Sequence, residues 1–232
     1  MLTINKINFP IYGIIIMISM IIGLLFNYYF LKKNNIDKKK VQLFLFLMFV
    51  YSFIGGILFD AIVNYDPNEL KIGLSSYGGA IGVCICAIVF EKMDNSNGLY
   101  VKSAILSLPL IYSISKLACF FAGCCYGRPY SGLFSVVYTY GLNIPLVPVQ
   151  LIETIVFWGL FGICYYNNKN DNIVPITIFL CAISKFALDF LRYRDKNIFL
   201  SPNQIVSIVF IIISLIIILK KKIKKRGIND FL

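Results

Sequence analysis

One apolar stretch ends in three charged side chains with a helical spacing. Lys185, Asp189 and Arg192 stand at i, i+4 and i+7, so a helix through them projects all three from one face. A charge near the centre of a bilayer costs about 2.5 to 3.5 kcal/mol on insertion scales, so it needs compensation. Such positions are where a function is to be sought in a membrane helix.

Two further apolar stretches supply polar groups of the same kind. Gln150 and Glu153 lie three residues apart on one helical face, and Lys116 precedes the run LACFFAGCCYGRP. Charges contributed by several helices at similar depth predict a polar cavity near the external leaflet that admits a lipid headgroup. Alternatively, Lys116, Glu153, Lys185 and Asp189 pair with one another and only hold the helices together. The residues alone leave both interpretations open.

Histidine is absent from the 232 residues. Its absence excludes a Ser/His or Cys/His nucleophilic pair and removes the commonest general base. Acid–base chemistry would therefore fall to Glu153, Asp189, Tyr77, Tyr126 or a cysteine.

The seven cysteines lie inside or at the edges of apolar stretches. Their odd number and their placement argue against a disulfide framework. The pairs at 84/86 and 124/125 lack a second pair at metal-ligand spacing, and no histidine completes them. We therefore expect neither a metal nor a cofactor.

The elements that must position these groups are membrane helices. A chain that is 59% hydrophobic and 14% charged has too little polar surface to cover a water-soluble globule. Its apolar stretches are roughly 20 residues long, enough for a helix to cross about 30 Å of hydrocarbon. We predict an all-α integral membrane protein with one transmembrane domain over residues 1–232. Its seven predicted spans are residues 9–30, 41–63, 76–91, 101–122, 148–166, 173–191 and 203–220.

Two lysine-rich blocks give this bundle an orientation. They follow the first and last spans at residues 32–40 and 220–226, whereas the loop after the second span, DAIVNYDPNELK, carries more acid than base. The positive-inside rule then places the N-terminus outside and the C-terminus in the cytoplasm, as a multi-pass protein of the bacterial cytoplasmic (inner) membrane. Because the net charge of +11 resides largely in these headgroup anchors, we expect no nucleic-acid partner.

One basic cluster lies on the external side, against that rule. Arg192, Arg194 and Lys196 follow the sixth span. A phosphate or headgroup ligand would explain them, and so would snorkelling at the interface.

Two segments depart from regular spans. The third span is short and begins SSYGGAIGVC, where Gly78 and Gly82 share a face and permit close approach by a helix or by a ligand. Residues 123–147 are rich in Gly, Tyr and Pro. We interpret them as an irregular external segment.

Five short motifs in sequence order resemble those of the bacterial prolipoprotein diacylglyceryl transferase family. The run KLACFFAGCCYGRP is similar to the family's Arg-Leu-Gly-Asn-Phe-Ile-Asn-Gly-Glu-X-X-Gly-Arg, and SSYGGAIG to Ser-Phe-His-Gly-Gly-X-X-Gly. VPVQLIE is similar to His-Pro-X-Gln-Leu-Tyr-Glu, and KFALDFLRYRD to Arg-Phe-X-X-Glu-Phe-Phe-Arg-X-X-Asp. LSPNQIVS resembles the Met-Gly-Gln-X-X-Ser that opens the family's last helix.

The resemblance implies an activity and a set of site residues. It implies transfer of diacylglyceryl from phosphatidylglycerol, or a related anionic phospholipid, to a cysteine thiol of a lipobox-containing precursor protein, with release of glycerol 1-phosphate. Catalytic roles are implied for Tyr77, Lys116, Glu153 and Arg192. Substrate contacts are implied for Gly78, Gly79, Cys119, Cys124, Tyr126, Gly127, Arg128, Gln150, Asp189 and Gln204.

Within that set, Arg192 and Lys116, with Arg128 nearby, would bind the phosphate. Gly78 and Gly79 would let the headgroup approach the backbone, and Gln150 and Glu153 would orient these groups.

The sequence also departs from the family pattern. Tyr77 stands in place of a histidine, Lys116 in place of an arginine, and Cys119 and Cys124 in place of an asparagine and a glutamate. Lysine keeps the charge but loses bidentate phosphate geometry, and tyrosine is a poor base near pH 7. Two alternatives follow: a noncatalytic lipid-binding or scaffold protein that kept the fold, and a transferase with a different acceptor.

Overall fold

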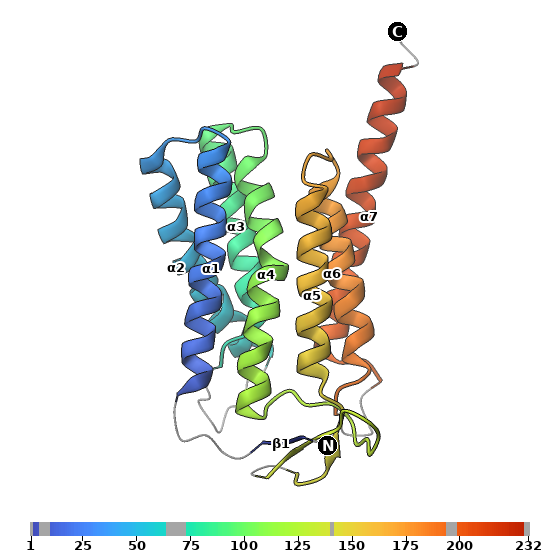
Figure 1. Ribbon diagram of the computed structural model, residues 1–232. Helices are drawn as coiled ribbons and strands as arrows, with labels where there is room; N and C mark the ends of the chain where they lie inside the picture. Colours follow the sequence, from blue (N-terminus) through green and yellow to red (C-terminus); the bar gives the residue numbers. More distant parts are fainter. Residues whose placement is uncertain (1, 5–9, 64–72, 140–141, 194–198, 230–232) are drawn as a thin grey trace. The chain divides into compact units, whose positions relative to one another are not determined.

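The computed structural model describes residues 2–4, 10–63, 73–139, 142–193 and 199–229 (Figure 1). Its seven helices agree with the seven predicted spans. Six of them are long and apolar enough to cross a membrane, and α6 is slightly shorter, with 17 residues. The chain is thus an all-α integral membrane protein. The helices are α1 (Ile11–Lys33), α2 (Lys38–Val63), α3 (Ser76–Asp94), α4 (Leu99–Ala122), α5 (Val149–Tyr166), α6 (Ile173–Asp189) and α7 (Pro202–Asn229).

The described residues form two compact units, residues 16–112 and residues 1–15 with 113–232. Each unit is described by itself. The unit of residues 16–112 has a core of buried apolar side chains around the rings of Phe44, Phe90 and Tyr100, whose centroids lie 4.9 to 5.5 Å apart. Edge-to-face and tilted ring packing of this kind fixes α2 against α3 and the start of α4.

Glycines bring α2 and α3 into backbone contact in this unit. A Cβ on Gly78 would lie 2.2 Å from the Gly55 carbonyl oxygen, and one on Gly82 would lie 2.0 Å from that of Tyr51. Real Cβ atoms do not approach so closely, so only glycine fits at these positions. Of the two interpretations of the Gly78 and Gly82 spacing, close approach by a helix is the one observed.

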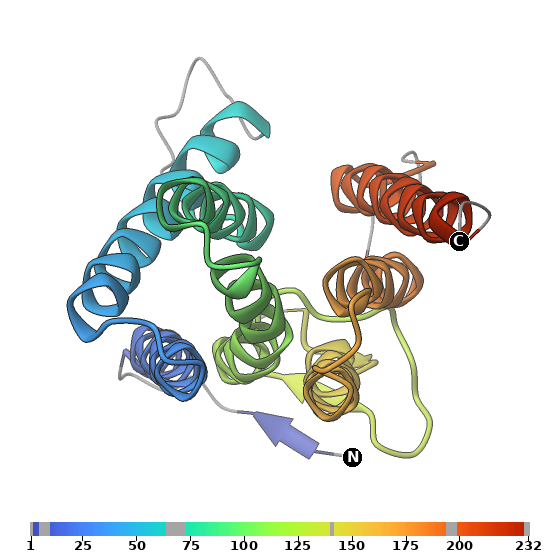
Figure 2. The same cartoon turned by 90° about the horizontal axis from the view of Figure 1, so that it is seen from above.

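The second unit holds α5, α6, α7 and a three-stranded sheet. Figure 2 shows α6 between α5 and α7, and α6 packs against both neighbours. The strands are β1 (Leu2–Ile4), β2 (Val136–Tyr138) and β3 (Pro145–Leu146). β1 pairs parallel with β2, placing Thr3 opposite Val137, and β3 pairs antiparallel with β2.

The sheet gives residues 123–147 a structured core. Ile4, Val136, Tyr138 and Leu146 are buried together against Phe120 at the end of α4. Two short strands therefore lie in the segment that the sequence describes as irregular, and the beginning of the chain completes their sheet.

A capping box starts α7. The Ser201 hydroxyl accepts a hydrogen bond from the Gln204 amide N–H at 3.1 Å, and the Gln204 side-chain oxygen accepts one from the Ser201 N–H at 3.2 Å. Pro202 occupies the first helical position, where its missing N–H costs nothing. This start holds Ser201 at a fixed place beside the end of α6.

Candidate active site

The centre of the site is a buried carboxylate between two cations. The Glu153 side chain on α5 is fully buried, and its Oε2 lies 3.0 Å from Lys116 Nζ on α4. Arg192 Nη2 donates to both oxygens of Glu153, at 2.8 and 3.1 Å. Glu153 thus joins three segments of the chain.

A second carboxylate completes the cluster from the end of α6. Asp189 Oδ1 lies 3.4 Å from Arg192 Nε, and its Oδ2 accepts a hydrogen bond from the Ser201 hydroxyl. Lys185, one helical turn before Asp189, is buried and close enough to interact electrostatically with Lys116, Glu153 and Arg192. The described cluster thus contains two carboxylates, Lys116, Arg192 and the buried amine of Lys185.

The backbone of the LACFFAGCCYGRP run positions Arg192. Gly127 pairs with Arg192 in an isolated antiparallel bridge, and the Arg128 N–H donates to the Leu191 carbonyl at 2.9 Å. The Tyr193 N–H donates to the Tyr126 carbonyl at 3.1 Å. The loop after α4 therefore fixes the residues that follow α6.

The loop has no room for a side chain at position 127. A Cβ there would lie 2.5 Å from the Val147 carbonyl oxygen, which accepts the hydrogen bond from the Gly127 N–H at 3.0 Å. A larger residue would push this loop, which pairs with Arg192, away from Val147.

The end of α4 forms a Schellman motif that brings two cysteines together. The Cys124 N–H donates to the Cys119 carbonyl at 3.1 Å, and the Gly123 N–H donates to the Phe120 carbonyl at 3.4 Å. Gly123 has a φ of 61°, the left-handed conformation that this motif requires. Because the motif packs the residue after its glycine onto the helix, Cys124 lies against Cys119.

Cys125 joins them through an unusual backbone. Its φ of 55° is left-handed, a conformation that non-glycine residues adopt rarely. The sulfur atoms of Cys119, Cys124 and Cys125 all lie within 4.8 Å of one another. Hydrogen bonds from the Cys119 thiol, and then from that of Cys124, lower the pKa of the Cys125 thiol.

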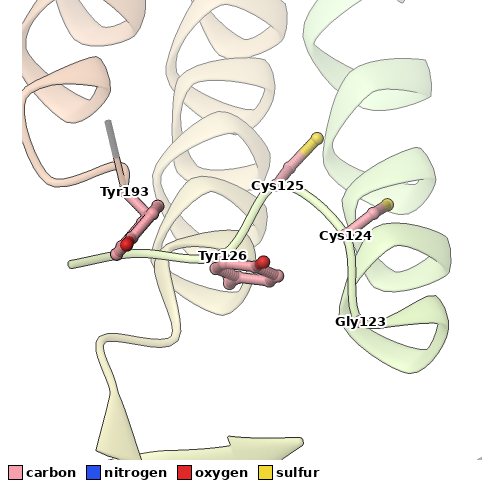
Figure 3. Close-up of a pocket in the computed structure, with 5 residues that line it drawn as sticks. All are labelled: Gly123, Cys124, Cys125, Tyr126 and Tyr193. Atoms are coloured by element: carbon pink, nitrogen blue, oxygen red, sulfur yellow. The ribbon is translucent and has the colours of Figure 1, made fainter. Parts of the chain in front are cut away.

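A cavity of about 420 Å³ opens beside these cysteines. It is lined by Gly123, Cys124, Cys125, Tyr126 and Tyr193, and Figure 3 shows the two sulfur atoms on the same side of the loop. The rings of Tyr126 and Tyr193 meet edge to face, with centroids 6.0 Å apart. The cavity thus has thiols on one wall and phenol rings on another.

Gln150 connects the cysteine loop to α5. Its side chain is fully buried, and Nε2 donates to the Cys124 carbonyl at 2.7 Å. Among the described residues, none donates a hydrogen bond to Gln150 Oε1. A buried amide oxygen in this state can accept a hydrogen bond from a ligand hydroxyl.

Comparison with known proteins shows the family of this chain. The model of the prolipoprotein diacylglyceryl transferase family matches residues 1–220. The chain belongs to this family. A phosphatidylglycerol–prolipoprotein diacylglyceryl transferase of Clostridium tetani (strain Massachusetts / E88) is 26% identical over 239 residues, covering 93% of this chain and 95% of the relative. The enzymes of the same name from Rickettsia akari (strain Hartford) and Rickettsia canadensis (strain McKiel) are 26% and 27% identical, covering 84% and 89% of this chain and 87% and 92% of the relatives.

Membership of the diacylglyceryl transferase family confirms the resemblance seen in the sequence. In this family member, Lys116, Glu153, Asp189 and Arg192 form one cluster. Their roles in substrate binding and catalysis stay predictions.

The other predicted site residues have several kinds of environment. Cys119, Cys124, Tyr126 and Gly127 lie in or beside the cysteine loop, as described above. Arg128 belongs to the same loop, but its side chain is exposed and its backbone anchors Leu191. Gln204 makes the capping box of α7, a structural contact in its own right.

The SSYGGAIG residues belong to the unit of residues 16–112. Tyr77 is half-buried, and Gly78 packs against α2. Gly79 is less constrained, since a Cβ there would lie 3.3 Å from the Ser52 hydroxyl oxygen. The Ser75 hydroxyl caps α3 by accepting from the Gly78 N–H at 3.5 Å. A contact of these residues with a lipid headgroup stays a prediction, and Arg194 and Lys196 lie outside the described residues.

Sequence reasoning missed two members of the site. Cys125 completes the sulfur cluster, and Ser201 anchors Asp189. The Ser-Pro-X-Gln order at Ser201 is a helix-start signal that could have located it. The left-handed backbone of Cys125 leaves no such signal.

Proposed function

We propose that this chain transfers a diacylglyceryl group from phosphatidylglycerol to a cysteine thiol of a lipoprotein precursor, in the bacterial cytoplasmic membrane. Family membership and the names of the relatives from Clostridium tetani and Rickettsia support the reaction. The two lysine-rich blocks support a cytoplasmic C-terminus. The acceptor sulfur forms a thioether, and glycerol 1-phosphate leaves.

The observation that carries the proposal is the bridging position of Glu153. A phosphate leaving group needs preorganised positive charge where its own charge develops. Glu153 holds Lys116 and Arg192 on either side of one carboxylate, at 3.0 and 2.8 Å. Two cations fixed in this way can serve as the preorganised charge that the phosphate needs.

Each residue then has a defined task. Arg192 and Lys116 bind the phosphate oxygens, and Glu153 and Asp189 position Arg192. Gln150 Oε1 accepts a hydrogen bond from a hydroxyl of the glycerol headgroup. The cavity beside Cys124 and Tyr126 receives the acceptor.

The replacement of the family histidine by Tyr77 favours a second candidate, a protein that binds the lipid without turning it over. Both candidates predict binding of phosphatidylglycerol through Arg192 and Lys116. Only the transferase predicts a product.

The test incubates the purified protein with phosphatidylglycerol and a lipobox peptide and measures the peptide mass. We expect a gain of one diacylglyceryl unit, and Arg192→Ala should lower the rate about 100- to 1000-fold, as removal of one transition-state donor does. Lys116→Ala should also lower it, whereas the exposed control Lys169→Ala should match the parent protein. Lipid binding with no product, together with unchanged lipoprotein processing in a deletion strain, would identify the binder instead.

A further inference from the structure

The three-cysteine cluster has the composition of a soft-metal site. Cys119, Cys124 and Cys125 each offer one sulfur, and all three sulfurs lie within 4.8 Å of one another. Three thiolates bound to one tetrahedral Zn²⁺ at about 2.3 Å stand roughly 3.8 Å apart. The cluster therefore reaches metal-binding geometry by small rotamer changes. The sequence spacing gave no sign of it, because one ligand comes from the last turns of a helix and the other two are consecutive residues of the loop that follows.

Backbone contacts hold this cluster in place. The Schellman motif at Gly123 fixes Cys124 onto Cys119, and the left-handed Cys125 turns its side chain back toward them. Gln150 Nε2 anchors the Cys124 carbonyl from α5. A preformed set of ligands of this kind lowers the ordering cost of binding.

The surroundings match the charge of such a centre. Lys116 interacts electrostatically with Cys119 and Cys125, and Arg192 interacts with Cys125. Positive charge at these places offsets the excess negative charge of three thiolates on one divalent ion. The same cations face the leaving phosphate in the proposed reaction.

Three protein ligands would leave a tetrahedral ion one further coordination position. Three protein ligands and one open position are typical of catalytic zinc, whereas structural sites use four protein ligands. Cys124 and Cys125 line the cavity that would receive an acceptor (Figure 3). An acceptor thiol entering there would meet the metal directly.

The reaction also needs a means of making a thiolate. A free cysteine has a pKa of about 8.5, so most of it is protonated near neutral pH. The chain contains no histidine, and Glu153 is engaged with two cations. Metal coordination deprotonates a thiol without a general base.

We infer that Cys119, Cys124 and Cys125 bind Zn²⁺, and that the acceptor thiol becomes its fourth ligand. This inference rests on the proposed transferase function and departs from the sequence-based expectation of no metal.

The chemical step follows from this coordination. The acceptor thiol releases its proton to water on binding. Its sulfur then attacks the glyceryl carbon that bears the phosphate, forming a C–S bond as the C–O bond breaks and the electron pair leaves on the phosphate oxygen. The metal keeps its oxidation state, and the neutral thioether dissociates.

The first experiment measures the metal site itself. Reduced full-length protein in lipid nanodiscs is titrated with Co²⁺ as a spectroscopic probe, and the zinc form is examined by X-ray absorption. We expect one ion per chain, a thiolate-to-cobalt charge-transfer band and three sulfur ligands. Cys119→Ser, Cys124→Ser and Cys125→Ser should each weaken the band, while the matched controls Cys84→Ser and Cys181→Ser retain it. An unchanged band in the triple variant would overturn the inference.

A measurement on the unaltered protein tests the site even if the cysteine variants fail to fold. Zn²⁺ should protect Cys119, Cys124 and Cys125 from maleimide, as located by peptide mass spectrometry. Equal modification with and without Zn²⁺ would overturn the site.

The second experiment addresses the acceptor. A lipobox peptide should intensify and shift the cobalt band, and the same peptide with serine for its cysteine should not. Transfer that persists at full rate in chelated, metal-free protein overturns the metal's role and leaves the transferase standing. If the metal is bound by three sulfurs but no thioether product forms, the metal site stands and the proposed transferase function fails.

Discussion

Glu153 is the residue on which the arrangement of the cluster depends. Its side chain is fully buried, and both of its oxygens are used by cations on other segments. A buried carboxylate of this kind stabilises the folded protein little more than an apolar residue would, because the cost of desolvating the charges offsets much of the attraction between them. Removing it alone is different, because Lys116 and Arg192 then lose the carboxylate between them in a medium of low dielectric.

We predict that Glu153→Gln destabilises the protein by about 3 to 5 kcal/mol, the usual cost of breaking a buried ion pair. Lys116 and Arg192 stay near the same positions but lose their common partner, so transfer should fall as well. Unfolding in mixed detergent micelles measures the first effect, and the peptide mass assay measures the second.

The matched control for this substitution is Asp171→Asn, which removes an exposed carboxylate in the turn before α6. It should leave stability and transfer unchanged. If Glu153→Gln behaved like this control, the ion-pair description of the site would be wrong.

At the scale of elements, α2 and α3 depend on glycine for their close packing. The backbone of Tyr51 occupies the space that a Cβ on Gly82 would need. Backbone atoms cannot move aside as the end of a flexible side chain can. The contact therefore tests whether these helices pack as described.

Gly82→Ala should cost about 1 to 3 kcal/mol through overpacking. Gly159→Ala in α5 is the matched control, since no atom lies within 4 Å of the added Cβ. There alanine should be neutral or stabilise by up to about 1 kcal/mol through its helix propensity. Equal effects of the two substitutions on unfolding would contradict the α2–α3 packing.

The elements also show how far the sequence predicts this protein. Hydropathy located the helices to within a few residues, because a membrane span needs a long apolar run. The exception is the end of α7, which runs to Asn229 and past the predicted residue 220, because its last turns are basic and carry no apolar signal. Hydropathy did not predict the pairing of β1 with β2. These strands have three residues each and are far apart in the sequence, so they leave no periodic signal. Spacing grouped Lys185, Asp189 and Arg192 correctly, but only tertiary structure showed that Glu153 is the partner of Arg192.

For the molecule as a whole, the lysine blocks predict which side of the membrane each terminus lies on. The arrangement of the helices alone does not determine this orientation. Seven spans place the two termini on opposite sides of the membrane. The positive-inside rule selects the cytoplasm for the C-terminal block.

A fluorescent protein fused after Leu232 should therefore fluoresce in bacterial cells, and alkaline phosphatase at the same point should be inactive. Phosphatase fused after Leu142, in the predicted external segment, should be active. The opposite pattern would invert the topology and remove the external location of the cysteine loop.

The composition of α6 has a consequence for biosynthesis. This helix has 17 residues and carries Lys185 and Asp189, both buried in the folded protein. Alone in lipid, the helix would expose two charged side chains to hydrocarbon, so the segment is a poor candidate for release from the translocon by itself. In the folded protein, Glu153 on α5 interacts with Lys185, and α5 and α7 supply the packing surfaces. We expect nascent α6 to wait beside the translocon until α7 emerges and the last helices enter the membrane together.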